Sequence, residues 1–540
     1  MALNILAVSS EAFPLAKTGG LGDAVGGLAQ ALLAEGVSMT LMLPAYRGVV
    51  EQLRDVRHVA QLNGLPGGSA NLLAGHCDKL GSLILLVQND ALYDRDGLYV
   101  DDDGKEYEDN AVRFAALSQA AARVAEGIVS VPRPDIVHIH DWHAALTPVY
   151  MRQLQIPDVK TVLTLHNIAF QGVFAMEVTS AIGIEERYCT ASGGEFWGRF
   201  NFLKAGIEYS DLITVVSHHY AQEILTPRFG CGLEGVLAER QHDLISIPNG
   251  IDTTLWNPEA DVYLPGCSFD RDDLHNKAVC KELLQKKFGL YVDPNVTVMA
   301  MGSRLTTQKM ADVAIAALPI ALDTHPGLQV CILGHGDKGL EQALIQLAKR
   351  YPRRVSAHIG FDESKAHLLH AGSDILLHGS RFEPFGLTPL YSMRYGTIPI
   401  GSRVGGMVDT IKDPGDAMGP RGMQTGTGIL FDGEQPMDMV NAIARAMQLH
   451  SRPEVWLSLQ RNAMSADFSW AKTAPVYLRA YQALQPRVVL DGISERRRAA
   501  GRTSMSAPAS AFAVKAKLAK PGRRSARTDV LDAPPGASAA

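Results

Sequence analysis

The segment LNILAVSSEAFPLAKTGGLGDAVGGL (residues 3–28) indicates the fold of the first part of the chain. An apolar run is followed by the polar residues SSE, and the stretch KTGGLGDAVGGL then supplies one lysine and five glycines. A buried strand that turns through glycines into a helix is the start of a βα unit, whose backbone N–H groups can face an anion. The lysine precedes the glycines here, whereas it follows them in the P-loop. The segment therefore predicts either an anion site served by Lys17, or a turn with positive φ at Gly19 or Gly20 beside a solvated lysine.

The same alternation of short apolar strands and longer helical patterns continues through most of the chain. Several of the runs are apolar on both faces, which is typical of buried parallel strands. The expected strands lie at residues 3–10, 38–46, 82–89, 134–142, 160–167, 211–217 and 243–250, and then at 296–303, 328–336, 354–361, 373–380 and 396–402. This many strands predicts two doubly wound α/β domains with separate sheets. Because ligands of such folds lie outside the carboxyl ends of the strands, we expect a cleft where the two domains face each other.

Composition and charge limit the class of protein. With 540 residues, 46% hydrophobic residues and a net charge of −6, the chain is expected to be globular, and nucleic acid is disfavoured as a main partner. The six cysteines form no C-x-x-C pair, so neither a disulfide framework nor a zinc site is predicted. No basic leader or membrane-length apolar run occurs, and we expect a cytoplasmic enzyme without a membrane partner. Residues 486–540 are rich in Ala, Ser, Arg and Pro, a composition that predicts a basic, disordered tail.

Two motifs resemble known sites without matching them. Gly334, Gly336 and Gly339 spell G-x-G-x-x-G, but a βα unit precedes them, so we interpret them as a tight βα turn that lines a nucleotide pocket rather than as a nicotinamide site. The run IVHIHDWHAAL (residues 136–146) has the order H-x-H-D-x-H, not the H-x-H-x-D-H of binuclear metallohydrolases. We expect core histidines there, no metal, and a functional carboxylate at Asp141, where the strand ends.

Two stretches in the second half carry charged side chains beside expected strand ends. In GSRLTTQKM (residues 302–310), Arg304 and Lys309 can hold a diphosphate, the arginine bidentately and the lysine as a point charge. In HGSRFEPFGLTPLYSMRYGTIPIGS (residues 378–402), Glu383 precedes Gly386, Leu387 and a probable helix start. Each stretch alone fits a surface ion pair and a capped helix equally well. Several anion-compatible loops at one cleft favour a ligand that carries phosphate.

Taken together, KTGGLGD, HDWHAAL, TLHNIAFQG, PNGID, RLTTQK and SRFEPFGLTPLYSMRYGT resemble bacterial glycogen synthases and the related plant starch synthases, in the same order from about residue 3 to 485. The resemblance implies the GT-B fold, with two Rossmann-like doubly wound domains facing a central cleft. The implied domains are residues 1–250 and 251–465, followed by a helix at 466–485 that crosses back to the first domain and the tail 486–540. It also implies retaining transfer of glucose from ADP-glucose to the non-reducing 4-OH of glycogen or an α-1,4-glucan primer, with release of ADP and without metal or cofactor.

The resemblance assigns roles residue by residue. The implied catalytic residues are Lys17, Asp141, His166, Arg304, Lys309 and Glu383. The implied ADP-glucose site consists of Lys17, Gly19, Gly20, Asp23, Asn249, Arg304, Lys309, Phe361, Glu383, Gly386, Leu387 and Thr388. In this assignment the basic side chains of both domains hold the donor phosphates, Glu383 binds the glucose hydroxyls, and Phe361 stacks on adenine. The implied reaction is a front-face displacement in which the donor phosphate takes the acceptor proton.

Departures from the family pattern and two rival functions stay open at this stage. Phe385, Pro389 and Met310 stand where cysteine, glutamine and glycine are usual, and His218-His219 replaces a Pro-Thr pair. One rival is a UDP-glucose enzyme of the sucrose or trehalose synthase type, disfavoured by KTGGLGD and by Tyr391, where such enzymes carry a second glutamate. The other rival is a glucan-binding or regulatory protein without activity. Trp142 and Tyr99 are candidates for glucan contacts, with core packing as the alternative and the favoured interpretation for Trp142.

Overall fold

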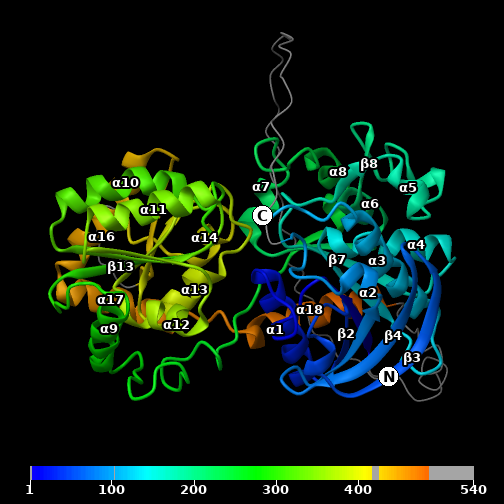
Figure 1. Ribbon diagram of the computed structural model, residues 1–540, viewed down its shortest axis with the longest axis horizontal. Coiled ribbons are helices and arrows are strands. Elements are labelled where there is room, and N and C mark those ends of the chain that lie inside the picture. The colour runs from blue at the N-terminus through cyan, green and yellow to red at the C-terminus, as the bar shows by residue number, and fades with distance from the viewer. Residues whose placement is uncertain (1–2, 102–103, 416–424, 486–540) are drawn as a thin grey trace, which may run out of the picture. The chain divides into compact units, whose positions relative to one another are not determined.

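A computed structural model describes residues 3–101, 104–415 and 425–485 of the chain (Figure 1). One compact unit that ends at Leu484 contains the elements described below. The tail 486–540, for which the sequence predicts disorder, lies outside the described residues. No helix of the described ranges is both long and apolar enough to cross a membrane.

The first sheet has nine strands in the order β12-β11-β7-β6-β1-β2-β5-β4-β3. The seven strands expected from the sequence form its parallel part, and they are β1 (Asn4–Val8), β2 (Ser38–Pro44), β5 (Ser82–Gln88), β6 (Ile136–His140), β7 (Lys160–Leu165), β11 (Leu212–Val215) and β12 (Leu244–Ser246). The antiparallel hairpin of β3 (Arg54–Leu65) and β4 (Gly68–Cys77), which the sequence pattern did not predict, extends the sheet beyond β5. A separate small sheet lies between β7 and β11 in the chain. It consists of β8 (Val173–Ala175), β9 (Glu195–Phe196) and β10 (Arg199–Asn201).

Helices connect the strands of the first sheet. They are α1 (Gly20–Ala34), α2 (Asp90–Tyr93), α3 (Asn110–Glu126), α4 (Thr147–Gln153), α5 (Val178–Ala181), α6 (Phe202–Tyr209), α7 (His218–Glu223) and α8 (Glu234–Glu239). Helix α3 is buried along most of its length because its small alanines let it pack closely against the sheet and α4. The resulting core places the loops that follow β1, β6 and β7 at one edge of the sheet.

The second sheet is entirely parallel, with six strands in the order β15-β14-β13-β16-β17-β18. Its strands are β13 (Thr297–Gly302), β14 (Leu328–Gly334), β15 (Val355–Ile359), β16 (Ile375–His378), β17 (Ile398–Ser402) and β18 (Ile429–Phe431). Numbered within this sheet, the order is 3-2-1-4-5-6, which is the doubly wound dinucleotide-domain order. Its helices are α9 (His275–Lys287), α10 (Ala311–Thr324), α11 (Lys338–Arg350), α12 (Glu363–Gly372), α13 (Leu387–Arg394), α14 (Gly405–Thr410), α16 (Pro436–His450) and α17 (Pro453–Ser465).

The final described helix, α18 (Trp470–Leu484), follows the second sheet in the chain but packs into the core of the first (Figure 1). It lies against α1, and the side chains of Tyr477 and Tyr481 are buried there. The hydroxyl of Tyr481 forms a 2.8 Å hydrogen bond with Nδ1 of His138, in the middle of β6. A buried polar contact of this kind fixes where α18 lies on the sheet.

Candidate active site

The KTGG loop joins β1 to α1 and is organised by Glu11. The carboxylate of this buried residue accepts hydrogen bonds from the N–H of Thr18 at 2.7 Å, its hydroxyl at 2.7 Å, and the N–H of Gly19 at 3.2 Å. The hydroxyl of Tyr99 donates to the same carboxylate at 2.7 Å. Gly19 has a φ of −156° and Gly20 is the first residue of α1, so the alternative of a positive-φ turn is wrong. Sequence reasoning missed Glu11, because a single glutamate after a strand carries no motif.

Close packing accounts for most glycines of this segment. A Cβ on Gly26 would lie 2.4 Å from the carbonyl oxygen of Phe13, and one on Gly27 would lie 2.0 Å from Nε1 of Trp470. A Cβ on Gly20 would lie 3.1 Å from Cδ1 of Leu387, at the start of α13. Helix α1 therefore touches its own preceding loop, α18, and α13 of the second sheet through positions where a side chain has little room.

Lys17 lies beside an acidic partner in the first turn of α1. Its ammonium pairs with Asp23 at 2.8 Å, and both side chains are partly exposed. Burial raises the pKa of Asp23, while the Lys17 ammonium opposes that rise. A ligand anion that reaches Lys17 would therefore compete with Asp23 for its ammonium.

Asp141 directly follows strand β6 and faces the loop that follows β7. Its carboxylate accepts the backbone N–H of His166 at 2.6 Å and that of Asn167 at 3.3 Å. Burial raises the pKa of Asp141 to about 7, although these two N–H groups act in the opposite direction. The residue has a φ of 55°, a conformation that is strained for a side chain other than glycine and that occurs most often at functional sites.

Near Asp141 the buried His138 and His140 lie side by side, and His140 contacts the half-buried His166. Nδ1 of His140 lies 3.0 Å from Nε2 of His166, and Nε2 of His138 lies 2.6 Å from the hydroxyl of Thr164. Burial lowers the pKa of His138 and of His166 to about 3, so both imidazoles are neutral at physiological pH. Within the described ranges, no group of three His, Cys, Asp or Glu side chains is placed to hold a metal ion.

A second charged cluster lies at the carboxyl end of the second sheet. The Lys309 ammonium, from the loop between β13 and α10, forms a short ion pair with Oε2 of Glu383. The same oxygen lies 3.1 Å from Nε2 of His378, the last residue of β16. Burial would raise the pKa of Glu383, but Lys309 and His378 hold it well below its usual range. Glu383 is therefore an ionised, buried acceptor of hydrogen bonds, and His378 is a second residue that sequence reasoning missed.

Arg304 interacts electrostatically with Glu383 of the second sheet and with Glu11, which organises the KTGG loop. Burial lowers the pKa of its guanidinium, while the carboxylates of Glu383 and Glu11 raise it. Glu11 also raises the pKa of Asp141 and of Asp23. Glu11 of the first half of the chain thus lies within electrostatic range of predicted site residues from both halves.

The helix start after Glu383 matches the sequence expectation. Gly386 precedes α13 with a φ of 86°, and Leu387 and Thr388 form its first turn. Pro389 fits this turn, because the N–H that it lacks has no partner within the first turn of a helix. Met310 has a φ of 52°, so the departure from glycine at this position costs some backbone strain. Tyr391 stacks on Trp256 with ring centroids 4.0 Å apart.

Two predicted residues lie apart from these contacts. The side chain of Phe361, between β15 and α12, is 70% exposed. Asn249 is buried in the turn after β12. In the described part of the chain, neither has a hydrogen bond or ion pair to another of the predicted site residues.

The other motifs singled out in the sequence have structural explanations. A Cβ on Gly334 would lie 2.1 Å from the carbonyl oxygen of Ser303, and one on Gly336 would lie 2.4 Å from that of Leu305, so these glycines let two loops meet. Trp142 is buried and packs on Phe114, as the core interpretation predicted. Tyr99 is half-buried and is the residue that donates to Glu11.

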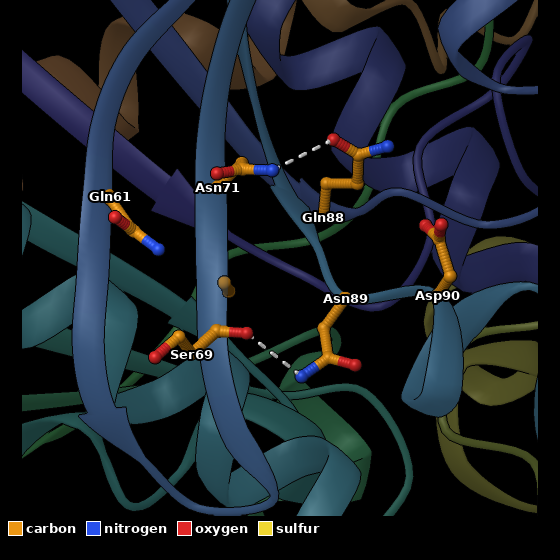
Figure 2. A pocket seen from close by; sticks show the side chains of 7 residues that line it. Gln61, Ser69, Asn71, Gln88, Asn89 and Asp90 are labelled. Carbon is orange, nitrogen blue, oxygen red and sulfur yellow. Dashed lines mark hydrogen bonds between the residues drawn. The ribbon is translucent and has the colours of Figure 1, made fainter.

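A polar pocket of about 230 Å³ opens on the far edge of the first sheet (Figure 2). It is lined by residues of β3, β4, β5 and the start of α2: Gln61, Ser69, Ala70, Asn71, Gln88, Asn89 and Asp90. The amide of Asn89 donates to the carbonyl oxygen of Ser69 at 3.1 Å. None of the predicted site residues lines this pocket.

Known proteins resemble this chain over most of its length. The family model described as starch synthase catalytic domain matches residues 4–239, and the model described as glycosyl transferases group 1 matches residues 281–462. The glycogen synthase of Bordetella bronchiseptica is 56% identical over 483 residues, which cover 89% of this chain and 95% of that protein. The chain belongs to the bacterial glycogen synthase family. The glycogen synthase of Ralstonia nicotianae, another member, is 50% identical over 90% of this chain and 89% of its own.

Solved structures confirm the GT-B fold of this family member. The catalytic domain of starch synthase IV from Arabidopsis thaliana, bound to ADP and acarbose, superposes with a TM-score of 0.82 at 28% identity, covering 89% of this chain and 99% of that one. A sucrose-phosphate synthase from Thermosynechococcus elongatus reaches a TM-score of 0.56 at 17% identity, which shows a shared fold alone. The chain is a glycosyltransferase of the glycogen synthase family, as the sequence motifs predicted.

Proposed function

We propose that the chain transfers glucose from ADP-glucose to the non-reducing 4-OH of glycogen or a shorter α-1,4-glucan, with retention and with release of ADP. The observation that carries the proposal is the cluster of the half-buried Arg304 and Lys309 with the buried Glu383, which lies within electrostatic range of Glu11, the carboxylate that organises the KTGG loop. Two fixed cations beside one ionised carboxylate suit a ligand with a diphosphate next to a hydroxyl-rich sugar.

In this proposal the basic residues stabilise the leaving group. The bond between C1 of glucose and the diphosphate oxygen breaks, and negative charge accumulates on departing ADP. Arg304 and Lys309 neutralise that charge from the second sheet and Lys17 from the first, which is electrostatic catalysis by preorganised cations. The acceptor oxygen bonds to C1 on the face that ADP leaves, and its proton passes to the diphosphate.

The carboxylates have different tasks in the proposal. Glu383 stays ionised because Lys309 and His378 lower its pKa, so it accepts hydrogen bonds from the glucose hydroxyls and does not donate a proton. Asp141 and the neutral His166 lie at the end of the first sheet, where they would contact the sugar ring. Asp23, Asn249, Phe361, Gly19, Gly20, Gly386, Leu387 and Thr388 complete the proposed donor site. The domain boundaries at residues 250 and 465 and the cytoplasmic location also remain predictions.

The test uses the purified chain with radiolabelled ADP-glucose or UDP-glucose and glycogen. We expect labelled polymer from ADP-glucose and far less from UDP-glucose, and labelling at least about 100-fold slower with a Lys309→Ala variant that binds glycogen normally. Labelling mainly from UDP-glucose would favour the sucrose or trehalose synthase type of donor use. Labelling from neither donor would favour a glucan-binding protein and contradict the proposal.

A further inference from the structure

Helices α7 and α14 are joined by reciprocal hydrogen bonds, in which a carboxylate of each helix accepts backbone N–H groups at the start of the other. The carboxylate of Glu223, the last residue of α7, accepts the N–H of Gly405, the first residue of α14, at 3.0 and 3.1 Å. In return, the carboxylate of Asp409 in α14 accepts the N–H groups of His218 and His219, at 2.6 and 3.0 Å. Because α7 follows strand β11 and α14 follows strand β17, this reciprocal contact connects the two sheets.

The same two helices hold the backbone of the Glu383 loop. The hydroxyl of Ser217, which caps α7, donates to the carbonyl oxygen of Pro384 at 2.7 Å. The N–H of Gly406 donates to the carbonyl oxygen of Glu383 at 3.0 Å. The contact is too close for side chains, since a Cβ on Gly405 would lie 1.8 Å from that carbonyl oxygen. The two peptide groups that flank Pro384, directly after Glu383, are thus fixed by α14 and by a residue of the first half of the chain.

We propose that Ser217 and Glu223 are positioning residues for Glu383. Ser217 fixes the loop directly, and Glu223 fixes it through the start of α14. The inference rests on the proposed role of Glu383 in binding the donor sugar. It assigns the first half of the chain a second task besides its own site residues: setting the backbone of a catalytic loop on the second sheet.

Burial makes these contacts hard to replace by solvent. The side chain of Ser217 is fully buried and Glu223 is 8% exposed, so deleting either leaves an N–H or carbonyl group without its partner. The Glu383 carboxylate must meet Lys309, from the loop between β13 and α10, and His378, at the end of β16, at the same time. A shift of the loop backbone by a fraction of an ångström would therefore misalign the carboxylate, and misalignment of about 1 Å can cost about 100-fold in rate.

The test compares Glu223→Ala, Glu223→Gln and Ser217→Ala with the wild type. Asp211→Ala is the matched control, because Asp211 also accepts a backbone N–H, from Thr161 at 2.8 Å, at the opposite edge of the first sheet. For each protein, the folded fraction is measured by circular dichroism, ADP affinity by calorimetry, and kcat and KM with ADP-glucose and glycogen.

We expect Glu223→Ala and Ser217→Ala to lower kcat per folded molecule by about 10-fold, equivalent to about 1.4 kcal/mol, with ADP affinity within about twofold of wild type. Glu223→Gln, which keeps an acceptor for Gly405, should recover most of the rate. Asp211→Ala should lower the melting temperature but not kcat.

Normal kcat in folded Glu223→Ala and Ser217→Ala would overturn the inference, as would a loss equal to that of Asp211→Ala. A wild-type protein that transfers no glucose, or a Glu383→Gln variant with full activity, would instead contradict the proposed function. The two failures are therefore distinguishable.

Discussion

Replacing Asp141 with asparagine should make the protein more stable at neutral pH while impairing transfer. Asparagine has nearly the same shape as aspartate at this strained backbone position, it keeps an oxygen that accepts the N–H of His166, and it removes a buried ionisable group. The native carboxyl has its pKa raised from 3.8 to about 7 because of burial. The folded chain therefore binds a proton more tightly than the unfolded chain between about pH 4 and pH 7.

The sign and size of the effect follow from this shift. Wild-type stability falls as the pH rises from about 4 to 7, because the unfolded chain releases the proton first. The rise in pKa corresponds to about 4 kcal/mol that the wild type loses across this window and that Asp141→Asn does not lose. If the described chain unfolds as one unit, this difference in unfolding free energy corresponds to a shift of about 4 °C in melting temperature. If the first sheet and its helices unfold alone, the shift is about 8 °C.

The assay is thermal unfolding of both proteins at pH values from 4.5 to 8.5, with the melting temperature measured by calorimetry. We expect the melting temperature of Asp141→Asn minus that of wild type to increase with pH up to about pH 7 and then stay constant. Asp312→Asn is the control, because the Arg381 guanidinium lowers the pKa of Asp312 and its stabilising contribution is lost only at lower pH. The Asp312→Asn difference should be constant from pH 5 to 8. A constant difference for Asp141→Asn as well would refute the reasoning.

Three further predictions concern the rate of transfer. Arg304→Ala or Lys309→Ala should lower kcat by about 100-fold or more, with a much smaller loss of donor affinity. The control Lys338→Ala, at an exposed lysine, should leave kcat unchanged. An equal loss in kcat and affinity would show that Arg304 and Lys309 only bind the ground state. Gly406→Ala should lower kcat by about 10-fold, because the added Cβ would lie 2.4 Å from the carbonyl oxygen of Phe385. Gly235→Ala, with open space around the added Cβ, should leave kcat unchanged. Similar kinetics for both variants would contradict the packing argument. His218→Pro should lower kcat about threefold relative to His218→Ala, because only proline removes the N–H that donates to Asp409. Identical rates for the two variants would show that this hydrogen bond has no effect on transfer.

The strands could be predicted where burial on both faces leaves a continuous apolar run. All twelve expected strands are present, and the alternation of strands and helices correctly predicts that the second sheet is parallel, although it does not predict the order of the strands. The hairpin of β3 and β4 escaped prediction because β3, at the edge of the sheet, is mostly exposed and reads RDVRHVAQLNGL, without a continuous apolar run. Strand β18 has only three residues, too few for a period.

Within the candidate site, residues that belong to motifs could be predicted, and residues that act through tertiary contacts could not. Lys309 and Glu383 were expected on separate loops, and the structure brings them into contact. Glu11 and His378 are ordinary residues at strand ends, and their roles depend on hydrogen bonds made after folding. The reciprocal contact of α7 and α14 likewise joins segments almost 200 residues apart, as the His218 to Asp409 bond with its separation of 191 illustrates.

A crystal structure of the chain with bound ADP tests the central claim most directly. The account predicts that Lys17 from the first sheet and Arg304 and Lys309 from the second all lie within about 3 Å of oxygens of one diphosphate. Cations that engage separate anions, or a diphosphate contacted from one sheet alone, would contradict it.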